Sequence, residues 1–125
     1  MFRVAAVQAT PVFLDRASTL ELAATEIAKA AADGADLVVF SESFVPGYPD
    51  WVWRRLPMSD GDWWLRFSDE SVDTGGSDLD PVREAAEAAG VWVALGVTER
   101  LQSGTLNNTV VYINAHGEVA SGIAS

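Results

Sequence analysis

Residues 34–49 read Gly-Ala-Asp-Leu-Val-Val-Phe-Ser-Glu-Ser-Phe-Val-Pro-Gly-Tyr-Pro, and the rest of the chain is organised around them. The apolar run from Leu37 to Phe40 follows a Gly-Ala-Asp turn and has the length of a core strand in a parallel sheet. Glu42 comes directly after it, at the kind of strand end where function collects in open α/β sheets. In the backbone that follows, two prolines fix φ and a glycine permits unusual φ, so we expect this loop to hold a defined shape.

The segment before this stretch predicts a strand and a helix. Residues 3–9 form a short apolar run, and apolar residues then recur at helical spacing. Asp15 or Ser18 can cap that helix, and Ser18 with Glu21 has the spacing of a capping box. Together with residues 37–40 they predict a right-handed βαβ unit. The apolar face of the helix would consist of Leu20, Ala23, Ala24, Ile27 and Ala31.

The second half of the chain predicts further helices and two more strands. A short helix fits residues 62–67, and a longer one begins at Asp78 or Asp80 and runs through Ala89 to Gly90. Residues 91–97 are nearly all apolar and predict the third strand, which ends in Thr98-Glu99-Arg100. After a Gly-containing turn, residues 106–114 alternate as a fourth strand that pairs antiparallel with the third. The fold class is therefore α/β.

Composition limits the partners of the chain. Its 125 residues include 18 acidic and 8 basic side chains, a formal net charge of −10, which argues against binding to nucleic acid or an anionic membrane surface. No signal peptide and no apolar run of transmembrane length is visible, so we expect a cytoplasmic protein. The chain contains no cysteine, which excludes disulfides and, as argued below, bears on its chemistry.

The stretch around Glu42 resembles the first signature of the nitrilase (carbon–nitrogen hydrolase) superfamily. The continuation Asp50-Trp51-Val52-Trp53 resembles the nitrilase branch, and residues 96–100 and 107–113 are similar to the two strands that precede the family's catalytic lysine. The resemblance therefore covers residues 3–119. The signature positions are Gly34, Leu37, Val38, Phe40, Glu42, Val45, Gly47, Tyr48 and Pro49.

This resemblance implies a fold and a site. Residues 1–125 would be a single, incomplete carbon–nitrogen hydrolase domain, the N-terminal part of an αββα sandwich with four strands and two to three helices. Glu42 would be the general base, while Tyr48 and Trp51 would help to form the substrate pocket. Glu99 would be a second pocket carboxylate, with a surface group or a partner for Arg100 as the alternative. The implied substrate is a small nitrile or amide, without cofactor or metal.

Two catalytic groups of that family have no counterpart in this sequence. The family continues with Gly-His-Arg-Lys-Leu and later carries a nucleophilic cysteine, and neither occurs before Ser125. Lys29, the only lysine, falls off the apolar face of its helix and predicts a solvated side chain. We therefore expect no activity from the chain alone. A non-catalytic association module and one half of a split enzyme are the alternatives.

The C-terminal residues suggest an origin for this truncation. A single-base deletion within codons for Gly-His-Arg-Lys-Leu can produce the sequence from Gly122 to Ser125 followed by a stop codon.

A partial sandwich would also leave an unpaired strand edge and an uncovered apolar face, so we expect self-association.

Overall fold

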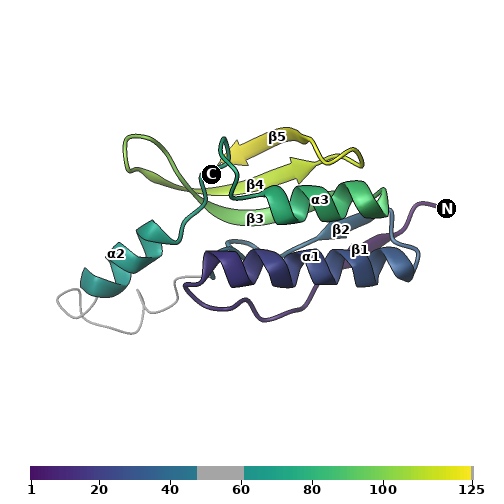
Figure 1. The fold of residues 1–125 in the computed structure, drawn as a ribbon, viewed down its shortest axis with the longest axis horizontal. Coiled ribbons are helices and arrows are strands. Elements are labelled where there is room, and N and C mark those ends of the chain that lie inside the picture. Colours follow the sequence, from purple (N-terminus) through teal and green to yellow (C-terminus); the bar gives the residue numbers. More distant parts are fainter. Residues whose placement is uncertain (48–60, 125) are drawn as a thin grey trace.

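A computed structural model of the chain describes residues 1–47 and 61–124. Within these ranges the chain forms five strands and three helices (Figure 1). In chain order they are β1 (Val4–Ala6), α1 (Arg16–Ala32), β2 (Leu37–Val39), α2 (Gly61–Asp69), α3 (Asp80–Ala89), β3 (Trp92–Arg100), β4 (Leu106–Ile113) and β5 (Val119–Ala124).

The strands form one sheet whose spatial order follows the chain order, β1-β2-β3-β4-β5. β1 pairs parallel with β2, and β2 pairs parallel with β3, as expected for strands that are joined through helices. β3 and β4 pair antiparallel across a tight turn, and β5 returns antiparallel along β4. The predicted βαβ unit and the antiparallel pairing of the third and fourth strands are confirmed.

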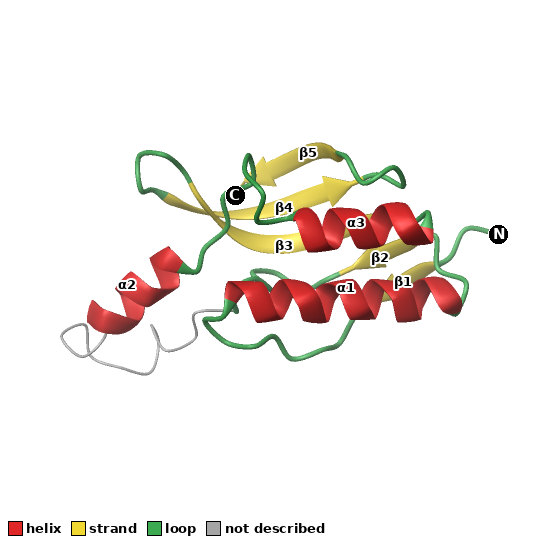
Figure 2. Cartoon of the chain, viewed as in Figure 1, coloured by secondary structure: helices red, strands yellow, loops and turns green. Residues whose placement is uncertain are grey.

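Helices α1 and α3 lie side by side on one face of the sheet (Figure 2). Their apolar sides pack on the strand residues that point toward them, and this layer is the core of the molecule. The buried residues from the helices are Leu20, Ala23, Ile27, Val82 and Ala86, and those from the strands include Val38, Val93, Leu95, Val97, Val111 and Ile113. The architecture is thus a mixed sheet with helices on one face, an α/β fold.

The termini of the two core helices follow the sequence signals in part. Asp15 caps α1, because its Oδ1 accepts a hydrogen bond from the backbone N–H of Ser18 at 3.0 Å. Ser18 therefore already lies within the helix, and a capping box starting from it is not the cap that forms. α3 begins at Asp80 and ends at Gly90, which takes the left-handed conformation with φ of 68°.

The structure corrects the number of predicted strands. The sequence predicts four strands, whereas a fifth, β5, adds to the free edge of β4. The third strand was expected to end in Thr98-Glu99-Arg100, and β3 indeed reaches Arg100, because its last residues pair with Leu106 to Asn108 of β4. In the described parts of the chain, the structure has no helix that is long and apolar enough to cross a membrane.

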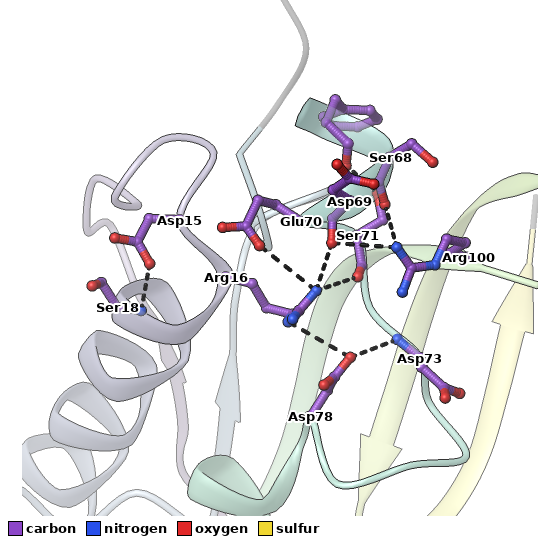
Figure 3. A network of polar contacts seen from close by, with 11 residues as sticks. Asp15, Arg16, Ser18, Ser68, Asp69, Glu70, Ser71, Asp73, Asp78 and Arg100 are labelled. Carbon is purple, nitrogen blue, oxygen red and sulfur yellow. Dashed lines mark hydrogen bonds and ion pairs between the residues drawn. The ribbon is translucent and has the colours of Figure 1, made fainter. Parts of the chain in front are cut away.

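Two arginines attach the end of α2 to the rest of the fold (Figure 3). Arg16, at the start of α1, donates hydrogen bonds to the carbonyl oxygens of Asp69 at 2.8 Å and Ser71 at 3.0 Å. Arg100, at the end of β3, donates to the carbonyl oxygen of Ser68 at 2.9 Å. Cationic donors suit the unpaired carbonyl groups at a helix C-terminus. Arg16 also forms ion pairs with Glu70 and Asp78.

Candidate functional site

A tight turn after β2 carries Glu42. The backbone N–H of Phe40 donates to the carbonyl oxygen of Ala94 at 2.9 Å and continues the strand pairing for one residue. The chain then turns, with the N–H of Phe44 donating to the carbonyl oxygen of Ser41 at 3.2 Å. Ser43 has a φ of 49°, which is uncommon for a residue with a side chain and requires support from its surroundings.

That support comes from β3. A hydrogen bond of 2.6 Å joins the hydroxyl groups of Ser43 and Thr98, both of which are buried. The backbone of Val45 pairs with β3 as an isolated parallel bridge to Val97, with the N–H of Thr98 donating to the carbonyl oxygen of Val45 at 2.8 Å. The turn is therefore fixed on both sides of Ser43.

Gly96 allows the turn to lie directly on the sheet. A Cβ atom at this position would be 2.1 Å from the carbonyl oxygen of Ser41 and 3.0 Å from the Cα atom of Glu42. Both obstacles are backbone atoms, which no rotamer change can move. Glycine inside a strand often marks such a close approach of another backbone. Gly96 thus sets the height of Glu42 above the sheet.

The side chain of Glu42 is exposed, and its Oε1 accepts a hydrogen bond from the Asn108 side-chain amide. Asn108 lies in β4 opposite Thr98, so both residues sit beside the turn. An ionised carboxylate offers about four lone-pair sites, so the contact with Asn108 leaves acceptor capacity for a proton. The site can therefore orient a carboxylate that accepts a proton from a neighbouring group.

Glu99 lies on the opposite face of the sheet from Glu42. Successive side chains in a strand point to opposite faces, and Glu99 follows Thr98 directly. Its Oε2 accepts a hydrogen bond from the Thr74 hydroxyl at 2.6 Å, and its Oε1 accepts one from the Thr109 hydroxyl at 3.1 Å. It lines a cavity of about 240 Å³ with these threonines, Val111, Val119 and Gly122. The structure does not bring Glu99 and Glu42 together.

The remaining predicted residues lie outside the site or outside the described residues. Tyr48 and Trp51 fall in the segment 48–60, which the structure does not describe. Lys29 is exposed on α1 and forms an ion pair of 3.5 Å with Glu26, as a solvated helix lysine does. Within residues 1–47 and 61–124, no group of three or more histidine, aspartate or glutamate side chains is arranged to hold a metal ion.

Sequence reasoning did not assign Gly96 and Asn108 to the site. A glycine inside an otherwise apolar strand was the available signal for Gly96. Asn108 carried no such signal, because its contact with Glu42 joins residues 66 positions apart and depends on the pairing of β3 with β4.

Known proteins are similar to this chain over almost all of its length. The profile of the carbon–nitrogen hydrolase family matches residues 3–124. An aliphatic nitrilase from Rhodococcus rhodochrous is 35% identical over 121 residues, which are 96% of this chain and 33% of that protein. An arylacetonitrilase from Fusarium vanettenii is 38% identical over 117 residues, which are 94% of this chain and 34% of that protein. The chain thus spans about a third of the length of these curated relatives.

Solved structures agree with the fold. A double mutant of the amidase from Nesterenkonia sp. AN1, in complex with acrylamide, superposes with a TM-score of 0.68 at 21% sequence identity. The superposition covers 99% of this chain and 42% of that amidase.

Proposed function

This chain belongs to the carbon–nitrogen hydrolase family, and we propose that it supplies the general base, Glu42, of a nitrilase-type hydrolase. The substrate would be a small nitrile or amide, the classes that appear in the names of its relatives. We further propose that residues 1–125 are one incomplete carbon–nitrogen hydrolase domain. The observation that carries the proposal is an exposed carboxylate on a fixed turn, with one oxygen held by Asn108.

The chemistry explains why such a carboxylate is needed. A thiol must lose its proton to attack the carbon of a nitrile, and a carboxylate within hydrogen-bond distance can accept that proton. The attack gives a thioimidate, which one water molecule converts to a thioester with release of ammonia. A second water molecule then releases the carboxylic acid and restores the thiol. A cationic group nearby stabilises the negative charge that develops on the substrate.

Glu42 alone does not complete this reaction. The sequence contains no cysteine to provide the thiol. Lys29 lies on an exposed face of α1 and is paired with Glu26, so it does not supply the cation beside Glu42. We therefore expect the 125-residue chain by itself to release no ammonia, and activity to require a polypeptide that brings both groups.

Ammonia release tests this proposal. The purified chain and its Glu42→Gln variant would be assayed with nitriles and amides, alone and after co-expression with the polypeptide encoded downstream. We expect no release from either chain alone. In the completed protein we expect activity that Glu42→Gln abolishes, because glutamine retains the shape but lacks the basic carboxylate. Ammonia release by the isolated wild-type chain above the level of the variant would contradict the proposal. So would a completed Glu42→Gln enzyme that keeps activity within tenfold of wild type.

The chain would also associate with itself, because part of a sandwich leaves an apolar sheet face uncovered.

A further inference from the structure

A second carboxylate lies in a cavity on the face of the sheet opposite Glu42. The cavity has a volume of about 240 Å³, and its lining comes from the loop between α2 and α3 and from three neighbouring strands. Because pockets for drug-sized ligands measure about 300 Å³ or more, this space suits a smaller molecule. The lining residues are Thr74 of the loop, Glu99 of β3, Thr109 and Val111 of β4, and Val119 and Gly122 of β5.

The absence of a side chain on Gly122 contributes to this space. Gly122 lies opposite Val111 in the register between β4 and β5, so both residues belong to the same face of the sheet. A Cβ atom on Gly122 would be 3.6 Å from Cγ2 of Thr109, and a longer side chain there would extend into the cavity. The apolar wall that Val111 and Val119 provide is therefore open to a ligand.

The charge of Glu99 has no cationic partner in the lining of the cavity. Arg100, the partner that the sequence offered as an alternative, donates instead to the carbonyl oxygens of Ser68 and Asp69. Among the described residues, no lysine, arginine or histidine lines the cavity. The formal net charge of −10 also favours a positively charged ligand over a negative one. A cation that enters the cavity therefore meets attraction and no competing positive charge.

The hydrogen bonds around Glu99 determine which kind of cation fits. The Thr74 hydroxyl donates to Oε2 of Glu99 at 2.6 Å, and the Thr109 hydroxyl donates to Oε1 at 3.1 Å. A hydroxyl group has a single hydrogen, so both threonines have used their donor and offer only lone pairs to a ligand. Each carboxylate oxygen also keeps a lone-pair site after it accepts one bond. The polar side chains of the lining are thus all acceptors, and the ligand must bring the donors.

We propose that this cavity binds a small primary alkylammonium ion. The ammonium group brings a positive charge and three N–H donors, which match the Glu99 carboxylate and the hydroxyl oxygens of Thr74 and Thr109. An alkyl chain of about three to five carbons packs against Val111 and Val119 and is removed from water. Alkylamines with a pKa of about 10.4, like that of lysine, carry this charge at neutral pH. The proposal does not depend on the role of Glu42.

Titration of the ¹⁵N-labelled chain with n-butylammonium chloride, followed by amide chemical shifts, tests the proposal. Glu99 is only partly buried and the ligand is small, so we expect a dissociation constant in the millimolar range. Sodium chloride keeps the ionic strength constant, because salt alone screens charges. The shifts should saturate and concentrate at the amides of Thr74, Thr109 and Gly122. n-Butanol lacks the charge and n-butyltrimethylammonium lacks the N–H donors, so both should bind at least about tenfold more weakly.

Two variants and a matched control locate the site. Glu99→Gln removes the charge and replaces one acceptor oxygen by a donor, so it should raise the dissociation constant at least about tenfold. Glu21→Gln is the control, because Glu21 is exposed on α1, does not line the cavity and changes the net charge equally. Gly122→Leu fills the cavity and leaves Glu99 in place, and it should also abolish saturable binding.

The outcomes separate clearly. Saturable binding by the wild type and by Glu21→Gln, together with its loss in Glu99→Gln, supports the proposal. If the amide spectrum shows that Glu99→Gln does not fold, Gly122→Leu takes its place. A wild-type chain without saturable shifts at the cavity up to about 100 mM n-butylammonium overturns the proposal. Unchanged affinity in a folded Glu99→Gln or Gly122→Leu variant overturns it as well. So does equal affinity of the wild type for n-butyltrimethylammonium, because the overall charge of the chain then attracts the ion.

Discussion

Gly96→Ala is the most direct test of how the fold positions Glu42. The new Cβ atom would be 2.1 Å from the carbonyl oxygen of Ser41 and 2.9 Å from the backbone nitrogen of Ser43. Real Cβ atoms essentially never approach other atoms within 3.0 Å. The turn must therefore move away from β3, although hydrogen bonds from β3 hold it on both sides.

The magnitude follows from the kind of obstacle. Overpacking a core costs about 1–3 kcal/mol when side chains can yield. Here backbone atoms must move, so we expect a loss near the upper end, about 3 kcal/mol of unfolding free energy. For a domain of this size that loss lowers the melting temperature by about 10–15 °C. The buried bond between Ser43 and Thr98 would lengthen or break at the same time.

Urea denaturation followed by far-UV circular dichroism measures the effect. Protein concentration must be equal in all samples, because self-association adds to apparent stability. Gly122→Ala is the matched control, since its Cβ would be 3.6 Å from the nearest atom, Cγ2 of Thr109. We expect this control to stay within about 0.5 kcal/mol of wild type. A Gly96→Ala chain that unfolds within 1 kcal/mol of wild type would refute the view that this contact fixes the turn.

Three further predictions concern a helix cap, an arginine and the site amide. A hydrogen bond from the backbone N–H of Ser18 lowers the pKa of Asp15 below its ordinary value of 3.8. The ionised carboxylate therefore contributes its full stabilisation above pH 3.8, and this stabilisation is lost as the pH falls through the pKa of Asp15 in the folded chain. Asp15→Asn keeps the cap without the titrating group, so its urea midpoint should drop less on acidification than that of the wild type. Arg16→Met should lower the free energy of unfolding, measured in urea, by about 1–2 kcal/mol and should speed amide hydrogen exchange in α2. Lys29→Met loses only an exposed ion pair and should change that free energy by less than about 0.5 kcal/mol. In a completed enzyme, Asn108→Leu should lower kcat at least about tenfold in an ammonia assay, because Glu42 loses its orienting donor.

Local patterns in the sequence predicted most of the fold. Apolar periodicity located α1, and short apolar runs located the parallel strands, because both signals arise within single segments. β5 was missed because Val119 to Ala124 contain small residues, a serine and a glycine and carry little intrinsic strand preference. This strand forms because β4 offers a free edge, a tertiary effect that no local pattern records.

The site was predictable only in part for the same reason. Glu42 follows from its place after a core strand together with the family resemblance. Glu99 also lies near a strand end, yet its side chain points to the helix side, because a shift of one residue along a strand reverses the face. The partners of Glu42 come from β3 and β4, so finding them required the register between these strands.

Glu42 lies on the side of the sheet that α1 and α3 do not cover. Asn108 and Val110 are two residues apart in β4 and therefore point to the same side of the sheet, so the base stands beside apolar strand residues. A polypeptide layer that covers these residues also brings its own atoms close to Glu42, and the same layer can therefore supply the thiol that this sequence lacks. We expect the completing polypeptide to raise the stability of the chain as it restores activity, because it binds the folded chain and not the unfolded one.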